Sequence, residues 1–127
     1  MDAAARLVQQ SAGLRNHLVV YKIAPAALWR ESERAGAFHG SPADMRDGFI
    51  HLSRADQIIG TATRHFAGAA DLLLIAVRAE SLDIRWEPSR GGDLFPHLYG
   101  ALPMTSVAWV RPLPLFDGVH VVPHLGP

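Results

Sequence analysis

Two short segments of this chain carry the side chains best suited to chemistry. They are DGFIHLS (residues 47–53) and FPHLYG (residues 95–100). Alternate side chains of an extended strand lie on one face, so His51 shares a face with Ser53, and His97 shares one with Tyr99. Each segment thus presents an aromatic ring, an imidazole and a hydroxyl group. That set suits a ligand with a planar ring and sugar hydroxyls, because the ring can stack while the hydroxyls exchange hydrogen bonds.

Each of these four side chains also has a purely structural interpretation. His51 can be a buried histidine that bonds to the backbone. Ser53 can be the N-cap of a following helix, a role compatible with binding because a helix N-terminus also attracts anions. His97 can belong to a turn, and Tyr99 can be ordinary packing. The sequence alone leaves these alternatives open.

Glu87 and Arg90 flank a glycine-rich turn, SRGGD. Alternation along the preceding strand places Glu87 on the face opposite Trp86. Glu87 and Arg90 can form a solvated pair. Alternatively, Arg90 binds a phosphate or carboxylate while the two glycines let the backbone approach that group. The segment is not a P-loop.

Metal and nucleophilic chemistry have less support in the sequence. The chain has no cysteine, which excludes disulfides, thiolate nucleophiles and cysteine-ligated metals. His51, His97 and Glu87 are suitable ligand types, but neither HxxxH nor HxH spacing accompanies them. No GxSxG elbow indicates a serine hydrolase. We therefore expect no metal site.

The charge balance restricts the class of partner. The chain has 12 Lys and Arg residues against 12 Asp and Glu residues. A neutral chain is a poor candidate for broad nucleic-acid binding or for docking on anionic membranes. No apolar run approaches the roughly 20 residues that span a bilayer, and the N-terminus does not resemble a signal peptide. We expect a cytoplasmic protein with a small-molecule partner, and the oligomeric state stays open.

A length of 127 residues predicts one domain, at residues 18–127, after a weakly helical extension at residues 1–17. Apolar patterns predict strands at residues 17–23, 49–53, 71–77, 83–88, 106–113 and 119–123. They predict helices at residues 25–35 and from Ser53 to about Gly68, with a surface loop at residues 36–48. The run at 71–77 should be buried on both faces, as the centre of a sheet. The fold class is α+β, with small, mainly antiparallel sheets and two helices.

DGFIHLS followed by FPHLYG resembles a family of small bacterial and plant proteins, domain of unknown function 952. The order of the two motifs makes the resemblance specific, whereas either motif alone is weak. The resemblance runs from about Val20 to Pro112. It also includes YKI at residues 21–23, Trp29, the turn at residues 36–40, Gln57, the apolar strand at residues 72–77 and Glu87.

This resemblance implies a fold like that of the ADP-ribosyltransferase superfamily. Members of that superfamily cleave NAD at the nicotinamide ribose or use NAD to remove an RNA 2′-phosphate. The resemblance implies that His51 holds a ribose hydroxyl, that Ser53 makes a neighbouring contact and that Tyr99 stacks on nicotinamide. The transferase glutamate usually follows that aromatic residue on a late strand. Here no glutamate follows Glu87, so Glu87 would have to act from a different strand.

Two functions therefore remain. The first is an ADP-ribosyltransferase-like domain that binds NAD or a related nucleotide, with NAD as a substrate and not a resident cofactor. In it, His51 and Glu87 are catalytic, and the ligand contacts are Ser53, Arg90, His97 and Tyr99. The second is a non-catalytic module that binds a small metabolite or a protein in the same cleft, which the missing late glutamate favours. In both, the two motifs are expected to form opposite walls of the cleft.

Overall fold

The computed structural model describes residues 18–127, so the predicted extension at residues 1–17 lies outside the described residues. The elements follow one another as β1 (Val19–Pro25), α2 (Ala26–Ala35), β2 (Ala37–Phe38), α3 (Pro42–Asp47), β3 (Ile50–His51), the 3-10 turn η1 (Ala55–Gln57), α4 (Ile58–His65), β4 (Leu72–Arg78), β5 (Ile84–Pro88), η2 (Arg90–Gly92), β6 (Leu94–Leu98), β7 (Leu102–Pro103), η3 (Met104–Ser106), β8 (Val107–Leu113), β9 (Leu115–Phe116) and β10 (Val119–His120).

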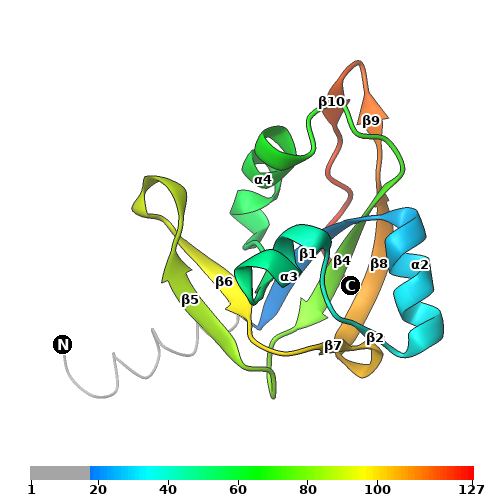
Figure 1. Ribbon diagram of the computed structural model, residues 1–127. Helices are drawn as coiled ribbons and strands as arrows, with labels where there is room; N and C mark the ends of the chain where they lie inside the picture. Colours follow the sequence, from blue (N-terminus) through cyan, green and yellow to red (C-terminus); the bar gives the residue numbers. More distant parts are fainter. Residues whose placement is uncertain (1–17) are drawn as a thin grey trace.

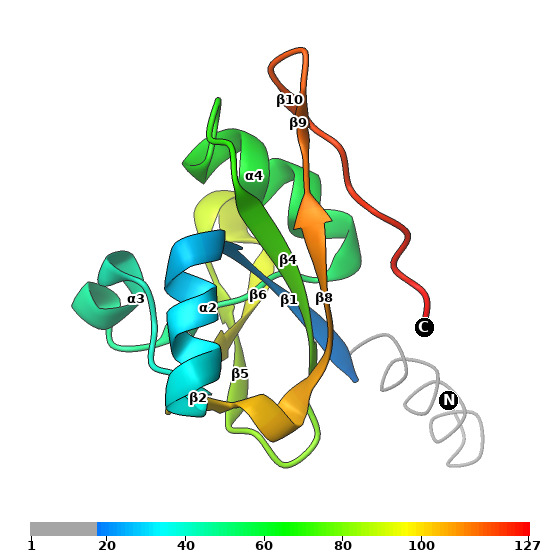
Figure 2. The ribbon, with the colours of Figure 1, turned by 90° about the vertical axis from the view of Figure 1, so that its right-hand side faces the viewer.

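Two antiparallel three-stranded sheets form the framework (Figure 1). The first has the order β1-β4-β8, and the second has the order β3-β6-β5. Two short pairs, β2 with β7 and β9 with β10, are antiparallel as well. Figure 2 shows β1, β4 and β8 side by side, with the β9–β10 hairpin extending beyond the end of β8. The predicted α+β class with mainly antiparallel sheets is confirmed.

Strand β4 is the centre of the first sheet, as its apolar run predicts. Its residues Leu72–Val77 are all buried. Because side chains alternate between the faces, Leu73, Ile75 and Val77 pack into one core with Trp29 from α2. Leu72, Leu74 and Ala76 pack into a second core with Ile58 and Ala62 from α4. The two helices thus cover opposite faces of this sheet.

The prediction for residues 36–48 is a surface loop that can include a short extended piece. The two-residue strand β2 fits that prediction, but the helix α3 does not, so the prediction is wrong at Pro42–Asp47. Ser41 is a helix N-cap: its hydroxyl accepts from the Asp44 N–H at 3.2 Å, while the Asp44 carboxylate accepts from the Ser41 N–H at 2.9 Å. Pro42 occupies the first turn, and Gly48, with φ of 85°, ends the helix in the left-handed region. The letters SPAD carry this capping box, and the density of glycine and proline around it concealed it.

The prediction that Ser53 caps the second helix is also wrong. Ser53 is still part of a sheet, since its N–H and carbonyl pair with those of Tyr21 at 2.8 and 2.9 Å. The N-cap lies one residue later, at Arg54, whose N–H donates to the side chain of Gln57 at 2.9 Å. The Ser53 hydroxyl instead bonds to that of Thr61 at 2.9 Å. Ser53 is thus free of any capping role and lies beside α4.

The C-terminal strand is shorter than predicted. Only Val119–His120 of the expected residues 119–123 are extended and paired, and they pair with β9. None of the helices in the described part of the chain has the length and apolar character needed to cross a bilayer.

Candidate functional site

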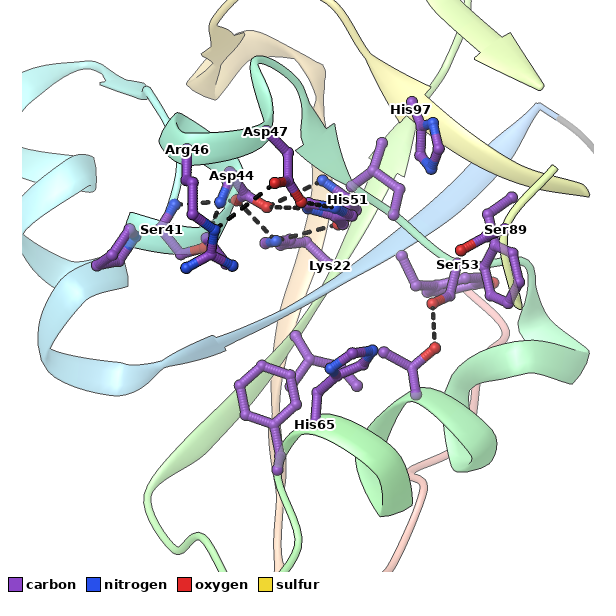
Figure 3. A pocket seen from close by; sticks show the side chains of 18 of the residues that line it. Lys22, Ser41, Asp44, Arg46, Asp47, His51, Ser53, His65, Ser89 and His97 are labelled. Atoms are coloured by element: carbon purple, nitrogen blue, oxygen red, sulfur yellow. Dashed lines mark hydrogen bonds and ion pairs between the residues drawn. The ribbon is translucent and has the colours of Figure 1, made fainter. Parts of the chain in front are cut away.

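A pocket of about 410 Å³ opens where β1, α3, β3, α4 and β6 meet (Figure 3). Small-molecule sites in proteins typically have volumes of about 300–1,000 Å³. The polar and aromatic side chains of its lining include Lys22, Ser41, Asp44, Arg46, Asp47, His51, Ser53, Thr61, His65, Ser89, Phe95 and His97. The pocket therefore has the size of a small-molecule site and a chemically rich lining.

The two sequence motifs lie side by side in one sheet. Strand β3 pairs antiparallel with β6, and His51 is directly opposite His97 in that ladder. Their ring centroids are 5.7 Å apart, and the rings are nearly perpendicular. The expectation that the motifs form opposite walls is therefore wrong. Cross-strand neighbours are close enough to interact directly, so the two imidazole rings contact each other.

Phe49 holds both imidazole rings in place. It stacks on His97 with a centroid distance of 4.0 Å and an interplanar angle of 21°. It also contacts the His51 ring, at 4.7 Å and 54°. Aromatic contacts of this kind restrict ring orientation as well as burying apolar area. Phe49 thus limits the orientations available to both histidines.

Asp44 is the buried anchor on the His51 side of the pocket. It is 2 % exposed, and its carboxylate has four hydrogen-bonding partners. One oxygen faces His51 Nδ1 at 2.6 Å and the His51 N–H at 3.1 Å. The other accepts from Lys22 Nζ at 2.8 Å and from the Ser41 N–H at 2.9 Å. A buried carboxylate satisfied in this way fixes α3 and the His51 ring together.

The pKa values of the buried pair follow from burial and from mutual attraction. Burial alone would raise the pKa of Asp44, but the hydrogen bond from His51 and the charge of Lys22 outweigh burial and hold that pKa well below its ordinary value. Burial also lowers the pKa of Lys22, and Asp44 offsets part of that effect. Lys22 Nζ donates a second hydrogen bond to the His51 carbonyl at 3.0 Å. The carboxylate thus stays ionised beside His51 at neutral pH.

The second ring nitrogen of His51 faces another acid. His51 Nε2 lies 3.0 Å from Asp47, whose side chain is 41 % exposed at the end of α3. Arg46 contacts the same carboxylate at 3.7 Å. Figure 3 shows Lys22, Asp44, His51 and Asp47 linked by these contacts along one side of the pocket. The His51 side chain therefore hydrogen-bonds to Asp44 and contacts a second carboxylate, Asp47, whereas the plain structural interpretation expected a bond to the backbone.

His97 has its own carboxylate partner. Its Nδ1 lies 2.8 Å from Glu87, which also accepts a hydrogen bond from the Tyr99 hydroxyl at 2.7 Å. These hydrogen bonds, with that of Tyr99 the larger, lower the pKa of Glu87. The guanidinium of Arg85 lies over the Tyr99 ring at 4.1 Å. Because β5 pairs with β6, Glu87 reaches His97 from the neighbouring strand, on the face that alternation predicted.

The structure places the predicted site residues in two groups. His51, Ser53 and His97 line the pocket, with His97 in a strand and not in a turn. Glu87 and Tyr99 are not among the described residues that line it. Glu87 instead bonds to His97, and the Tyr99 hydroxyl bonds to Glu87. Nothing is described of the Arg90 side chain, although its neighbour Ser89 lines the pocket. The ligand-binding roles of all these residues stay predictions.

Sequence reasoning missed Lys22, Asp44, Arg46, Asp47, Thr61 and His65. Lys22 carried a signal, since a lysine inside the apolar run VVYKI is either exposed or buried with a partner. Asp44 carried one as the last residue of the capping box SPAD. Nothing in the local pattern connects Thr61 or His65 to the site. Within residues 18–127, no group of three or more histidine or acidic side chains is arranged to hold a metal ion.

Comparisons with known proteins agree with the resemblance drawn from the motifs. No curated protein matches the chain. The crystal structure of protein CC0527 from Caulobacter crescentus is 45% identical, covers 81% of this chain and 93% of its own, and gives a TM-score of 0.77. The solution NMR structure of CC0527 is 47% identical in sequence, covers 80% of this chain and 90% of its own, and gives a TM-score of 0.73. Residues 23–110 match the family described as Protein of unknown function (DUF952). The chain therefore belongs to the DUF952 family.

Proposed function

We propose that the pocket binds a nucleotide of the NAD or ADP-ribose class, in a domain whose fold is related to that of the ADP-ribosyltransferases. One observation carries the proposal: His51, Ser53 and His97, from separate motifs, converge on a single pocket with the aromatic ring of Phe95. Hydroxyl and imidazole groups can bind ribose hydroxyls, and an aromatic ring can stack on a base. This convergence is what a ring-and-sugar ligand requires.

The charges around the pocket fit the phosphates of such a ligand. Arg46 lines the pocket, and its side chain is 73 % exposed. Its contact with Asp47 is long, at 3.7 Å, so Arg46 can turn toward an anion. His65 lines the same pocket from α4. Lys22 is less available, because Asp44 already neutralises it. We therefore place the phosphates near Arg46, and the ribose near His51 and Ser53.

A non-catalytic binding module is the second candidate for the same pocket. Its supporting observation is the position of Glu87, whose carboxylate is bonded to His97 and Tyr99 and is not part of the pocket lining. In a transferase, a carboxylate stabilises the oxocarbenium-like ribose directly. Incubation with NAD followed by measurement of free nicotinamide separates the candidates. Turnover that is lost in Glu87→Gln supports the transferase, and binding without turnover supports the module.

The first test of nucleotide binding is thermal unfolding with NAD or ADP-ribose. A ligand at 100 times its Kd stabilises the folded state by about 2.7 kcal/mol, which raises the Tm by several degrees. We expect His51→Ala to abolish this rise. His39→Ala is the matched control, because His39 is exposed and lies outside the pocket, and it should keep the full shift. No shift of the wild-type protein at millimolar ligand would contradict the proposal.

A further inference from the structure

We propose that His51 and His97 act as a proton-transfer pair that hydrolyses a phosphodiester bond of a nucleotide, with His97 as the base and His51 as the acid. The inference rests on the proposed function, since it requires that the pocket hold a nucleotide. It goes beyond that function because it assigns a reaction, and a role to each ring. It also gives a positioning role to the two carboxylates bonded to the Nδ1 atoms, Asp44 at His51 and Glu87 at His97.

The distance between the two rings fits one substrate group. The centroids are 5.7 Å apart on directly paired strands, and both residues line the pocket. An acid or base works at a heavy-atom distance of about 2.6–3.2 Å from the oxygen it serves. One phosphate with its attacking and leaving oxygens can therefore contact both rings at once. Phe49, which contacts both rings, keeps this spacing fixed.

The surroundings of His97 are those of a base. Its Nδ1 is bonded to the Glu87 carboxylate, so Nδ1 carries a hydrogen, and in the neutral ring the lone pair is on Nε2. Every fully buried side-chain nitrogen or oxygen in residues 18–127 has a hydrogen-bond partner. Nε2 makes no such bond to a described residue, and the His97 side chain, which is 6 % exposed, is part of the pocket lining. The free lone pair is thus available to a ligand.

The surroundings of His51 are those of an acid. Both of its ring nitrogens face carboxylates, Asp44 at 2.6 Å and Asp47 at 3.0 Å. When the ring is protonated, both nitrogens carry hydrogens, and each has a carboxylate within reach. The Asp44 contact is buried, whereas Asp47 is 41 % exposed and can be displaced by a ligand. Displacement of Asp47 leaves the Nε2 proton of His51 facing the substrate.

The groups that line the pocket favour a phosphate centre over a glycosidic one. Glycosyl transfer from NAD needs a carboxylate directed at the ribose. The Glu87 carboxylate is already bonded to His97 and Tyr99, and the two carboxylates that line the pocket, Asp44 and Asp47, both contact His51. Phosphate chemistry needs cations and a pair of proton-transfer groups, and Arg46 and the two histidines provide these. The observed arrangement is therefore better matched to cleavage at phosphorus.

The reaction balances with water as the only co-reactant. His97 Nε2 takes a proton from water, and the water oxygen forms a bond to phosphorus. The bond between phosphorus and the leaving oxygen breaks, and that oxygen keeps the electron pair. His51 Nε2 donates its proton to the leaving oxygen. The product of a 2′,3′-cyclic nucleotide is a nucleoside monophosphate, and a proton exchange with solvent restores both rings.

The test is hydrolysis of 2′,3′-cyclic AMP and of the dinucleotide ApA, followed by chromatography of the products across pH. We expect a bell-shaped rate profile for the wild-type protein. His51→Gln and His97→Gln should each lower kcat by 100-fold or more. The remaining rate of His97→Gln should lose the acidic limb of the profile, and that of His51→Gln should lose the basic limb.

The charged and titratable groups facing these rings are Lys22 from β1, Asp44 and Asp47 from α3, Arg85 and Glu87 from β5, and Tyr99.

Further variants keep the test decisive if His97→Gln, which is buried, fails to fold. Glu87→Gln should lower kcat and shift the acidic limb, because the hydrogen bond to His97 Nδ1 changes. His39→Gln should leave the profile unchanged. A wild-type protein that is stabilised by ADP-ribose but releases no monophosphate from either probe overturns this inference and leaves the proposed function standing. The absence of both stabilisation and turnover overturns both.

Discussion

Replacement of Asp44 with alanine is expected to lower the free energy of unfolding by about 3–5 kcal/mol. The carboxylate is 2 % exposed, and its removal leaves Lys22, at 5 % exposed, as a buried charge without a counter-charge. It also removes the capping box of α3 and the hydrogen bond that holds His51. Urea denaturation of the wild-type and Asp44→Ala proteins at pH 7 measures the loss.

Asp47→Ala is the matched control for this prediction. Asp47 belongs to the same short helix and also contacts His51, but its side chain is 41 % exposed. Exposed ion pairs contribute about 0–1 kcal/mol, so this variant should lose no more than that. Equal losses for the two variants would show that the buried pair has no special role.

The same pair predicts how stability depends on pH. The folded protein holds the pKa of Asp44 below the ordinary value of about 3.9, so the unfolded chain binds this proton first as the pH falls. The stabilisation is therefore complete above that ordinary value and is lost progressively below it. Asp44→Ala should lack this part of the acid dependence. An unchanged difference in stability between the two proteins from pH 6 to pH 2 would contradict the prediction.

Replacement of Ile75 with alanine is expected to cost about 2–5 kcal/mol of folding stability. Ile75 is completely buried in β4, the central strand, and packs into the core that also holds Trp29. The deleted atoms leave a cavity that strands paired on both sides cannot easily close. Thermal or urea unfolding measures the loss. Ile59→Ala is the control, because Ile59 on α4 is 50 % exposed and should cost about 0.5 kcal/mol or less. Similar costs at the two positions would contradict the assignment of β4 as the centre of the core.

The longer strands β1, β4, β5 and β8 were the most predictable part of the fold, whereas β6 and the two-residue strands β2, β7 and β9 were not among the predicted strands. A continuous apolar run identifies β4 as a central strand, because a strand covered on both faces has no polar positions. Alternation also placed Glu87 correctly, since Ile84 and Trp86 pack against the core while Glu87 faces His97. Helix α3 was missed because the glycines and proline around it outweighed the single capping signal in SPAD.

The candidate site was predicted in its residue types but not in its assembly. His51, Ser53 and His97 were identified from local motifs, and the structure places all three on the pocket. The direct pairing of His51 with His97 is a contact between strands far apart in the chain, and no local pattern encodes it. For the same reason Asp44 could be identified as a cap but not as the partner of Lys22 and His51.

Backbone amide NMR during titration with ADP-ribose tests the central claim, nucleotide binding in this pocket, most directly. Signal changes should be saturable and should centre on the pocket-lining parts of β1, α3, β3, α4 and β6, with His51 and Ser53 among the largest. The β9–β10 hairpin, which lies outside the pocket lining, should stay unchanged. Saturable changes at the pocket are the predicted result. No changes at millimolar ADP-ribose, or changes confined to another surface, would contradict the account.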